Sequence, residues 1–306
     1  MKSALINEFG GPDVVVEGEA RLPQPQANDV LVRIEAASVN PLDVKILAGY
    51  MQPIFPVAFP YAPGTDFSGV IESVGEQVSD LKAGDRVVGR TSPSQGGAFA
   101  THLVIAASEL CVIPTQMSFE QAAALPTAYG TASQALFDIG KLQRGQRVLI
   151  HAGAGGVGSM AIQLAHLAGC HVIATASAKN LELLKSLGAD EVIDYRTQTL
   201  DSVGEIDLVL DTLGGETLEE SWQVLGPGGR ISTLVEFNIE SRDGHAGEFV
   251  FFAGAVPFLP EAIRQFSVGQ LQIIIDSTFT LAETRAALEK VATGHARGKV
   301  VIRPGS

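Results

Sequence analysis

Residues 147–177 read RVLIHAGAGGVGSMAIQLAHLAGCHVIATAS and place a glycine-rich turn between an apolar run and a helix-like segment. Gly153, Gly155 and Gly158 match the spacing G-x-G-x-x-G, directly after a predicted strand and at the start of a predicted helix. A helix N-terminus in this position offers free N–H groups and partial positive charge to phosphates, so the turn predicts a dinucleotide site. The alternative is a glycine-rich turn without a ligand, which the strand-turn-helix context disfavours.

Each glycine of the turn has an expected steric role. Gly153 permits the tight turn, Gly155 lets the backbone approach a pyrophosphate, and Gly158 lets the helix pack closely against the strand. We therefore expect the cofactor phosphates to lie against the whole segment, which consists of Gly153, Ala154, Gly155, Gly156, Val157 and Gly158.

The segment that follows the second strand of this unit, ATASAKN, bears on the choice between NAD and NADP. NAD sites usually carry an Asp or Glu here for the ribose hydroxyls, and this segment has no carboxylate. Ser177 can hydrogen-bond a 2′-phosphate and Lys179 can neutralise part of its charge, so we expect NADPH. The alternative is that Ser177 caps the following helix and Lys179 is a solvated surface lysine.

The pattern around the turn predicts two domains. From residue 147 the chain alternates strand-like and helix-like segments through RVLIHA, HVIATA, EVI, DLVLDT, RISTLV and EFVFFA, which indicates a mostly parallel, doubly wound sheet. Residues 1–118 contain short alternating runs such as Val30, Val32 and Ile34, which indicate a barrel-like β unit.

Two further segments complete this plan. The Ala-rich stretch after residue 118 is helical in character, with Ser118 and Gln121 at the spacing of a capping box. The tail from residue 256 is expected to rejoin the first domain through a helix, a strand at LQIIID, a second helix and a last strand at KVVIRP.

Composition excludes several classes of protein. The chain has 306 residues, of which 46% are hydrophobic and 18% charged, and its net charge of −13 disfavours nucleic acid as a partner. No apolar run reaches the roughly 18 residues of a membrane helix, and the opening MKSALINEFGGPDVV lacks the apolar core of a secretion signal. With only Cys111 and Cys170 there is no disulfide framework, so we expect a cytoplasmic protein that associates with neither membranes nor nucleic acid.

Several motifs occur in the order and approximate spacing of one family: SVNPLDVKILAGY, PGTDFSGVIESVG, GDRVVG, GGAFATH, AALPTAYGTASQAL, GAGGVG, LGADEVIDYR and HARGKVVI. On these motifs the sequence resembles the zinc-independent, quinone oxidoreductase-like branch of the medium-chain dehydrogenase/reductase superfamily, which includes zeta-crystallin-like proteins and enone reductases. The resemblance implies an α/β protein with a GroES-like β-barrel catalytic domain (1–118 and 256–306) and a doubly wound, parallel-sheet Rossmann domain for NADP (119–255).

The resemblance also implies roles for individual residues. Asn40 is expected near the nicotinamide and the acceptor, Lys45 near the developing oxyanion, and Thr131 at the nicotinamide edge. Ser177, Lys179 and Tyr195 match the residues that surround the 2′-phosphate in NADPH-dependent members. Each has an alternative: Lys45 is then an exposed helical lysine, Thr131 a helix-lining hydroxyl, and Tyr195 a half-buried residue at a strand end.

Other polar residues leave the proton donor open. Tyr50, Tyr61 and Tyr129 are candidate donors or pocket walls, and Tyr50 is taken as the catalytic candidate. Asp43 either caps the helix that follows Asn40 or pairs with Lys45. A structural role is expected for Asp66, and a loop-capping role for Asp211.

We expect no catalytic metal. Zinc alcohol dehydrogenases of the same superfamily carry a Cys in the first motif, GHE in the second and a four-cysteine lobe, whereas this chain has Asn40-Pro41, Gly64-Thr65-Asp66 and no such lobe. No two of its six histidines stand at HxxxH spacing, and zinc needs about four N, S or O ligands.

Without a Lewis acid, reduction of an activated acceptor is easier than oxidation of an alcohol. We therefore expect NADPH-dependent hydride transfer to a quinone or to an α,β-unsaturated carbonyl compound. The alternatives are an NADPH-binding redox sensor or structural protein with little turnover, followed by a zinc alcohol dehydrogenase. The apolar segment EFVFFAGAV would be exposed at a sheet edge in a monomer, so a homodimer is also expected.

Overall fold

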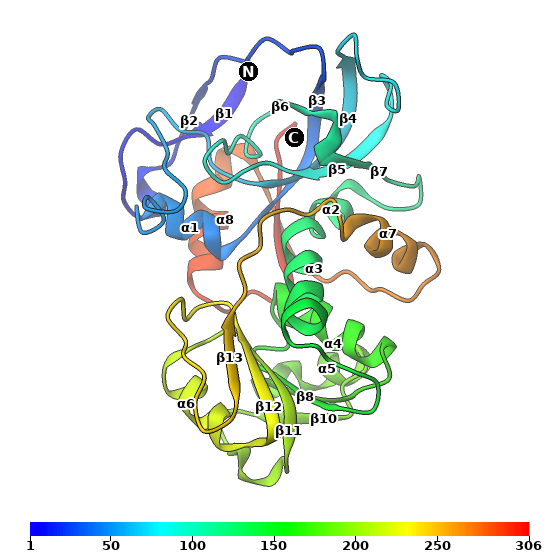
Figure 1. Cartoon of the computed structure of the whole chain (residues 1–306). Coiled ribbons are helices and arrows are strands. Elements are labelled where there is room, and N and C mark those ends of the chain that lie inside the picture. The colour runs from blue at the N-terminus through cyan, green and yellow to red at the C-terminus, as the bar shows by residue number, and fades with distance from the viewer. Residues whose placement is uncertain (306) are drawn as a thin grey trace. The chain divides into compact units, whose positions relative to one another are not determined.

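The computed structural model describes residues 1–305, and these fall into two compact units (Figure 1). Unit 1 consists of Met1–Thr127, Gly254–Gly269 and the residues from Ile273 onward, and unit 2 of Ala128–Ala253 and Gln270–Gln272. The C-terminal tail belongs to the same unit as the N-terminal half of the chain, as the sequence pattern indicates.

Unit 1 is built on a seven-stranded sheet with the order β14-β15-β3-β4-β5-β7, in which β6 also pairs with β3. The pairing is antiparallel except between β14 and β15. The sheet strands are β3 (Asp29–Val39), β4 (Asp66–Val74), β5 (Arg86–Arg90), β6 (His102–Ala106), β7 (Leu110–Val112), β14 (Ile275–Thr280) and β15 (Lys299–Arg303). A separate pair joins β1 (Lys2–Leu5) and β2 (Val16–Glu19).

Helices α1 (Pro41–Leu47), α2 (Phe119–Ala123), α7 (Leu259–Ser267) and α8 (Thr284–Ala292) complete unit 1, with short 3₁₀ turns at Pro12–Val14, Ala107–Glu109 and Leu281–Glu283. The predicted alternation on β3 is present, because Val30, Val32 and Ile34 are all buried. They pack in one core with Phe67 and Phe99.

Unit 2 is a six-stranded sheet with the order β10-β9-β8-β11-β12-β13, and every pairing in it is parallel (Figure 1). Its strands are β8 (Arg147–Ile150), β9 (His171–Ala176), β10 (Glu191–Asp194), β11 (Ile206–Asp211), β12 (Leu225–Thr233) and β13 (Ala246–Phe249). The connecting helices are α4 (Gly156–Leu167), α5 (Leu181–Ser186) and α6 (Gly215–Gln223), with 3₁₀ turns at Ala178–Asn180 and Leu200–Ser202. The order reverses between β8 and β11, as in a doubly wound sheet.

The two units meet in sequence at Ala128, whereas the predicted boundary is residue 119. The difference has a local cause: Ser68 donates a hydrogen bond to the Phe119 carbonyl (2.6 Å), and the Arg86 guanidinium lies 4.3 Å from the Phe119 ring centre. These contacts hold α2 against unit 1. Helix α3 (Pro126–Ser133) follows it and continues into a π-helical segment, Gln134–Ile139.

Two predicted strands are displaced along the chain. The strand predicted at LQIIID begins only at Ile275, because the Gln163 amide both donates to the Gln272 carbonyl and accepts from the Gln272 N–H (2.9 and 2.7 Å) and so holds residues 270–272 in unit 2. The strand predicted at EFVFFA ends at Phe249. No helix within residues 1–305 is long and apolar enough to span a membrane.

Candidate functional site

The glycine turn joins β8 to α4 in unit 2. Its positive φ falls on Ala152 (48°) and not on Gly153, which corrects the role expected of Gly153. A Cβ on Gly153 would lie 3.1 Å from the Ala174 Cβ, so this glycine allows close approach to β9. A Cβ on Gly158 would lie 2.4 Å from the Ala152 carbonyl oxygen, as expected for a helix packed directly on the turn.

The N-terminus of α4 is open on the side of Gly155. This residue is the N-cap with ordinary extended backbone (φ −77°, ψ 178°), and a Cβ added to it would meet only the Ala152 oxygen within 4 Å, at 3.3 Å. Gly155, Gly156 and Val157 are half-buried, and the first turn of α4 contains no acidic residue. Because the first N–H groups of a helix have no acceptor within it, this end fits an anionic pyrophosphate.

A buried histidine, His151, directly precedes the turn. His151 Nε2 lies 2.9 Å from Ser221 Oγ, and the Ser221 hydroxyl donates to the Thr217 carbonyl. Because that hydroxyl proton is already used, the His151 ring is the donor at Nε2. Nδ1 is then unprotonated and lies 3.3 Å from Thr175 Oγ1. Burial lowers the pKa of His151 to about 4, which keeps the ring neutral. The Thr175 hydroxyl also accepts the Ala152 N–H (3.3 Å), and this fixes the start of the turn.

The ends of β9 and β10 bring the predicted 2′-phosphate residues to one edge of the sheet. The Tyr195 N–H donates to the Ala176 carbonyl (3.3 Å), so Tyr195 lies beside the residue that precedes Ser177. Lys179 is exposed, and Ser177 is the N-cap residue of the 3₁₀ turn Ala178–Asn180 without a side-chain capping bond. The segment after β9 thus presents a hydroxyl and a cation.

Sequence reasoning missed Arg196 at the same edge. Its guanidinium lies 5.7 Å from the Tyr195 ring centre, and its side chain is exposed. The signal in the sequence was the cation directly after Tyr195 in EVIDYR. Arg196 and Lys179 give this edge two positive charges that a 2′-phosphate can engage.

In unit 1 the predicted catalytic residues belong to α1 and the residues that flank it. Asn40 is the N-cap of α1, and its backbone N–H donates to Asp43 Oδ2 (2.7 Å), so Asp43 caps the helix and the pairing with Lys45 is not formed. Lys45 is half-buried in the last turn of α1, whereas Tyr50, after the helix, is 78% exposed. Asn40 is buried, at 3% exposure.

Asn40 is one member of a polar group that we call the Asn40 cluster: the buried residues Asn40, Asp43, Asp66, Arg90 and Lys299, and the half-buried Thr127. Asn40 Nδ2 donates to Asp66 Oδ2 (3.0 Å), and Lys299 Nζ donates to Asn40 Oδ1 (2.5 Å). Asp66 also accepts the Thr127 N–H at Oδ2 (3.1 Å) and the Thr127 hydroxyl at Oδ1 (2.7 Å). The structural role predicted for Asp66 is therefore confirmed.

The charges of the cluster are poorly solvated. Burial raises the pKa of Asp43 to about 7, with the negative charge of Asp66 adding to the effect, and Asp43 Oδ1 has no hydrogen-bond partner. Burial lowers the pKa of Lys299 and of Arg90, and in both cases the attraction of Asp66 opposes the shift. The cluster holds both signs of charge with almost no access to water.

The four remaining candidate residues are all buried. Tyr61 is buried in the core and donates to the Pro93 carbonyl (2.7 Å), and burial raises its pKa, so its hydroxyl already has a structural partner. Tyr129 and Thr131 are buried in α3. Asp211 accepts the Leu213 N–H as the predicted loop cap.

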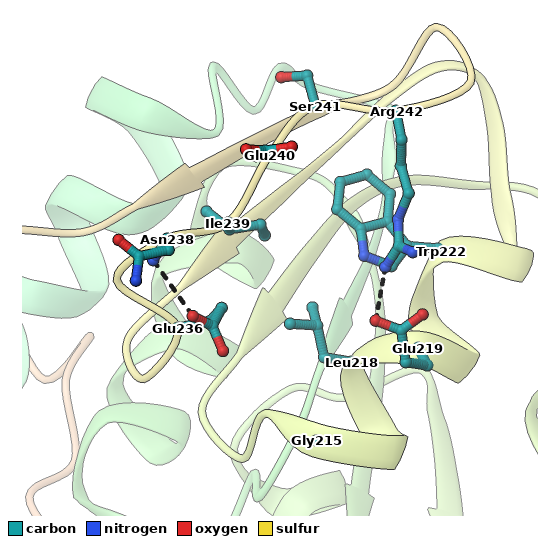
Figure 2. Close-up of a pocket in the computed structure, with 10 residues that line it drawn as sticks. All are labelled: Gly215, Leu218, Glu219, Trp222, Glu236, Asn238, Ile239, Glu240, Ser241 and Arg242. Carbon is teal, nitrogen blue, oxygen red and sulfur yellow. Dashed lines mark hydrogen bonds and ion pairs between the residues drawn. The ribbon is translucent and has the colours of Figure 1, made fainter.

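Unit 2 also contains a cavity of about 440 Å³ between α6 and the loop after β12 (Figure 2). Figure 2 shows Arg242 beside the Trp222 ring and paired with Glu219, in agreement with a guanidinium 4.5 Å from the ring centre and an ion pair of 2.7 Å. None of the predicted site residues lines this cavity. Within residues 1–305, no group of three or more His, Cys, Asp or Glu side chains is placed to hold a metal ion.

Two family models match the chain. Residues 26–115 match the alcohol dehydrogenase GroES-like domain, and residues 187–302 match a model described as zinc-binding dehydrogenase. The first match lies in unit 1, and the second spans parts of both units.

Similar proteins cover nearly the whole chain. A chloroplastic quinone-oxidoreductase homolog of Spinacia oleracea is 34% identical over 314 residues, which are 96% of this chain and 95% of the relative. A chloroplastic NADPH-dependent alkenal/one oxidoreductase of Arabidopsis thaliana is 33% identical over 316 residues, 99% of this chain and 80% of the relative. The structure of the quinone oxidoreductase from Coxiella burnetii superposes with a TM-score of 0.91 at 32% identity and covers 99% of both chains. These matches confirm the predicted GroES-like and Rossmann-like architecture.

Proposed function

Because the chain belongs to the quinone oxidoreductase-like branch of the medium-chain dehydrogenase/reductase superfamily, we propose that it reduces a quinone or an α,β-unsaturated carbonyl compound with NADPH. The chain is an oxidoreductase that uses a nicotinamide cofactor. The NADPH preference and the class of acceptor are the proposed parts.

The observation that carries the cofactor assignment is the open N-terminus of α4 beside Gly155. No side chain of the protein fills the space where a Cβ would stand, and no acid lies in the first helical turn. The residues fit a pyrophosphate there, held by N–H groups of the first turn. The 2′-phosphate would then be held by Ser177 and Lys179, which follow β9, and by Tyr195 and Arg196, which follow β10. These residues present hydroxyls and cations, and the segment after β9 carries no carboxylate.

When bound, NADPH supplies a hydride, and the protein has to orient the acceptor and stabilise the negative charge that develops on its oxygen. The Asn40 carboxamide has one N–H and one lone pair beyond the contacts with Asp66 and Lys299. Lys45 is half-buried on the same helix, and we propose that its ammonium group binds the developing oxyanion. Thr131 remains the proposed contact of the nicotinamide edge, and Tyr50 the proposed proton donor.

We further propose that the reaction needs no zinc. The two motifs that carry ligands in zinc alcohol dehydrogenases hold Asn40-Pro41 and Gly64-Thr65-Asp66 in this chain. Asp66 is the one carboxylate among them, and its oxygens already accept hydrogen bonds from Asn40 and Thr127. A metal there would have to displace these partners.

The decisive experiment follows NADPH oxidation at 340 nm with 1,4-benzoquinone, 9,10-phenanthrenequinone, an alkenal and an aliphatic enone, each repeated with NADH and with EDTA. We expect turnover that prefers NADPH and is unaffected by EDTA, and the quinone-to-enone ratio then assigns the acceptor class. Loss of turnover in EDTA with recovery on adding zinc would overturn the metal-free reaction. Tight NADPH binding without turnover of any acceptor would favour a redox sensor instead.

We also propose that the protein is a homodimer. Strand β13 lies at the edge of its sheet, with β12 as its neighbour within the chain, and Phe237 stacks on Phe249 at 4.3 Å between ring centres. Phe237 and Phe251 are both exposed. Pairing of β13 with a second copy would cover this apolar edge, as edge strands require. A monomer mass in light scattering that does not change with protein concentration would contradict the proposal.

A further inference from the structure

The Asn40 carboxamide is held at both ends by charged groups from distant parts of the chain. Lys299, at the start of β15, donates to its oxygen, and Asp66, at the start of β4, accepts from its nitrogen. Lys299 also donates to the Val39 carbonyl (3.1 Å), which places the ammonium group between two acceptors at the end of β3. Asp66 is fully buried and Lys299 is 4% exposed, so water does not compete for these contacts.

These two partners permit only one orientation of the amide. An ammonium group can only donate and an ionised carboxylate can only accept. Rotation of the Asn40 amide by half a turn would put its N–H₂ against Lys299 and its oxygen against Asp66, which creates two repulsive contacts in place of two attractive ones. Asp66 is kept an acceptor by the N–H and the hydroxyl of Thr127, which both donate to it.

Packing alone does not explain the ammonium group at this position. Burial of a charge remains costly even after pairing, and an apolar side chain of similar volume is often at least as stable in its place. The attraction of Asp66 and Asp43 offsets part of that cost, yet burial still lowers the pKa of Lys299. Lys299 provides donors to the Asn40 side-chain oxygen and to the Val39 carbonyl, and an apolar side chain would provide neither.

We propose that Lys299 and Asp66 are positioning residues that hold the Asn40 amide in the one orientation in which its free N–H and its free lone pair are presented for the reaction. The inference rests on the proposed function in one respect, which is that Asn40 contacts the acceptor or the nicotinamide. Neither positioning residue is assigned a contact with a reactant.

The experiment compares K299M, N40A and the K299M/N40A double variant with the parent protein, at saturating NADPH and with the best acceptor of the panel above. K299M is expected to lower kcat roughly 10- to 100-fold, because loss of orientation by about an ångström has effects of that size. In the N40A background the same substitution should lower kcat by less than about 2-fold, since a residue that acts through Asn40 has nothing left to position. D66N is a second variant if K299M does not fold, because an Asn at 66 can either donate or accept and so removes the constraint.

The control is R86M. Arg86 is a cation of the same unit whose guanidinium donates to the Pro114 and Met117 carbonyls, and it does not touch the Asn40 cluster. R86M should lower the thermal midpoint and leave kcat per folded molecule unchanged. Equal losses of kcat on introducing K299M into the parent and into N40A would overturn the positioning role.

A readout that does not use turnover keeps this test separate from that of the proposed function. The side-chain NH₂ signals of Asn40, identified in a ¹H–¹⁵N spectrum as the pair lost in N40A, should shift in K299M and stay in place in R86M. If the parent protein reduces no acceptor, the proposed function fails while this readout still reports on the Lys299–Asn40 contact. Unshifted signals in K299M together with an active parent protein would refute the inference alone.

Discussion

The glycine turn of unit 2 and the Asn40 cluster of unit 1 are built in opposite ways. The turn works through backbone N–H groups and through side chains that are absent, and its parts lie within six consecutive residues, 153–158. The cluster works through side chains that carry charge, and the contact between Lys299 and Asn40 spans 259 positions of the chain. One region is specified locally and the other only by the complete fold.

This difference predicts how each region responds to change. In the turn, an added methyl group is the most damaging substitution, because space is what the glycines provide. In the cluster, the removal or neutralisation of a charge matters most, because each buried charge compensates another.

The largest effect is expected for G158A. Its Cβ would lie 2.4 Å from the Ala152 oxygen and 2.8 Å from the Gly153 Cα, both backbone atoms that the sheet holds in place, so we expect a loss of about 3 kcal/mol in unfolding free energy. Urea unfolding followed by circular dichroism measures it.

The matched control for this substitution is G155A. Its Cβ would meet the Ala152 oxygen at 3.3 Å, at an unstrained backbone angle, so stability should fall by less than about 1 kcal/mol while NADPH binding weakens roughly 10-fold or more. If G155A bound NADPH as well as the parent protein, the pyrophosphate would not lie against this residue.

The contrast also explains what could be predicted from the sequence. The turn, the parallel sheet and the Ser118–Gln121 capping box follow from spacing and periodicity, and the structure contains all three. The positive φ at Ala152 did not follow, because alanine rarely adopts this conformation and four glycines stand directly after it.

The cluster could be predicted only in part. Asn40 came from a family resemblance and Asp66 from its place in a glycine-rich turn, but nothing in GKVVIRP marks Lys299 as buried, since lysines almost always lie at the surface. The Gln163–Gln272 contact was missed for the same reason: long-range hydrogen bonds between polar side chains and backbone leave no periodic signal.

The next largest effect is expected at the 2′-phosphate edge. K179A should weaken NADPH binding by about 1.5 to 3 kcal/mol and leave NADH binding nearly unchanged, because in the proposed assignment Lys179 contacts only the 2′-phosphate. Calorimetric titration with both cofactors measures this.

K185A is the control, as Lys185 is a surface lysine of the neighbouring helix α5 that pairs with Glu182. R196A should act in the same direction as K179A. Equal losses for NADH and NADPH in K179A would remove the 2′-phosphate assignment.

A smaller and pH-dependent effect is expected at Asp43. In the folded protein the pKa of Asp43 is raised to about 7 from 3.8, which means that folding favours the protonated carboxyl group. The contribution of Asp43 to the free energy of unfolding is therefore fully present below about pH 4 and is lost as the pH rises through 7. D43N keeps an oxygen for the Asn40 N–H but does not ionise. Relative to the parent protein, D43N should therefore gain about 1 to 2 kcal/mol of unfolding free energy between pH 5 and pH 8.

D85N is the control for the pH series. Asp85 is half-buried, and hydrogen bonds from Lys82 hold its pKa below the usual value, so the difference between D85N and the parent protein should not change between pH 5 and pH 8. A constant difference for D43N as well would show that Asp43 is already charged at pH 5.

The smallest effect compares two helix caps of the same unit. Ser118 accepts the Gln121 N–H (3.2 Å) at an exposed helix start, whereas at the start of α1 Asp43 accepts the Asn40 backbone N–H (2.7 Å) inside the Asn40 cluster. S118A should cost about 1 kcal/mol in unfolding free energy, because one N–H of the first turn loses its acceptor. Since the cap is solvated and carries no charge of the cluster, kcat and NADPH affinity should equal those of the parent protein. A drop in kcat for S118A beyond its folded fraction would mean that α2 transmits strain to Asp66 through the Ser68–Phe119 hydrogen bond, and the local and the long-range regions would then be coupled.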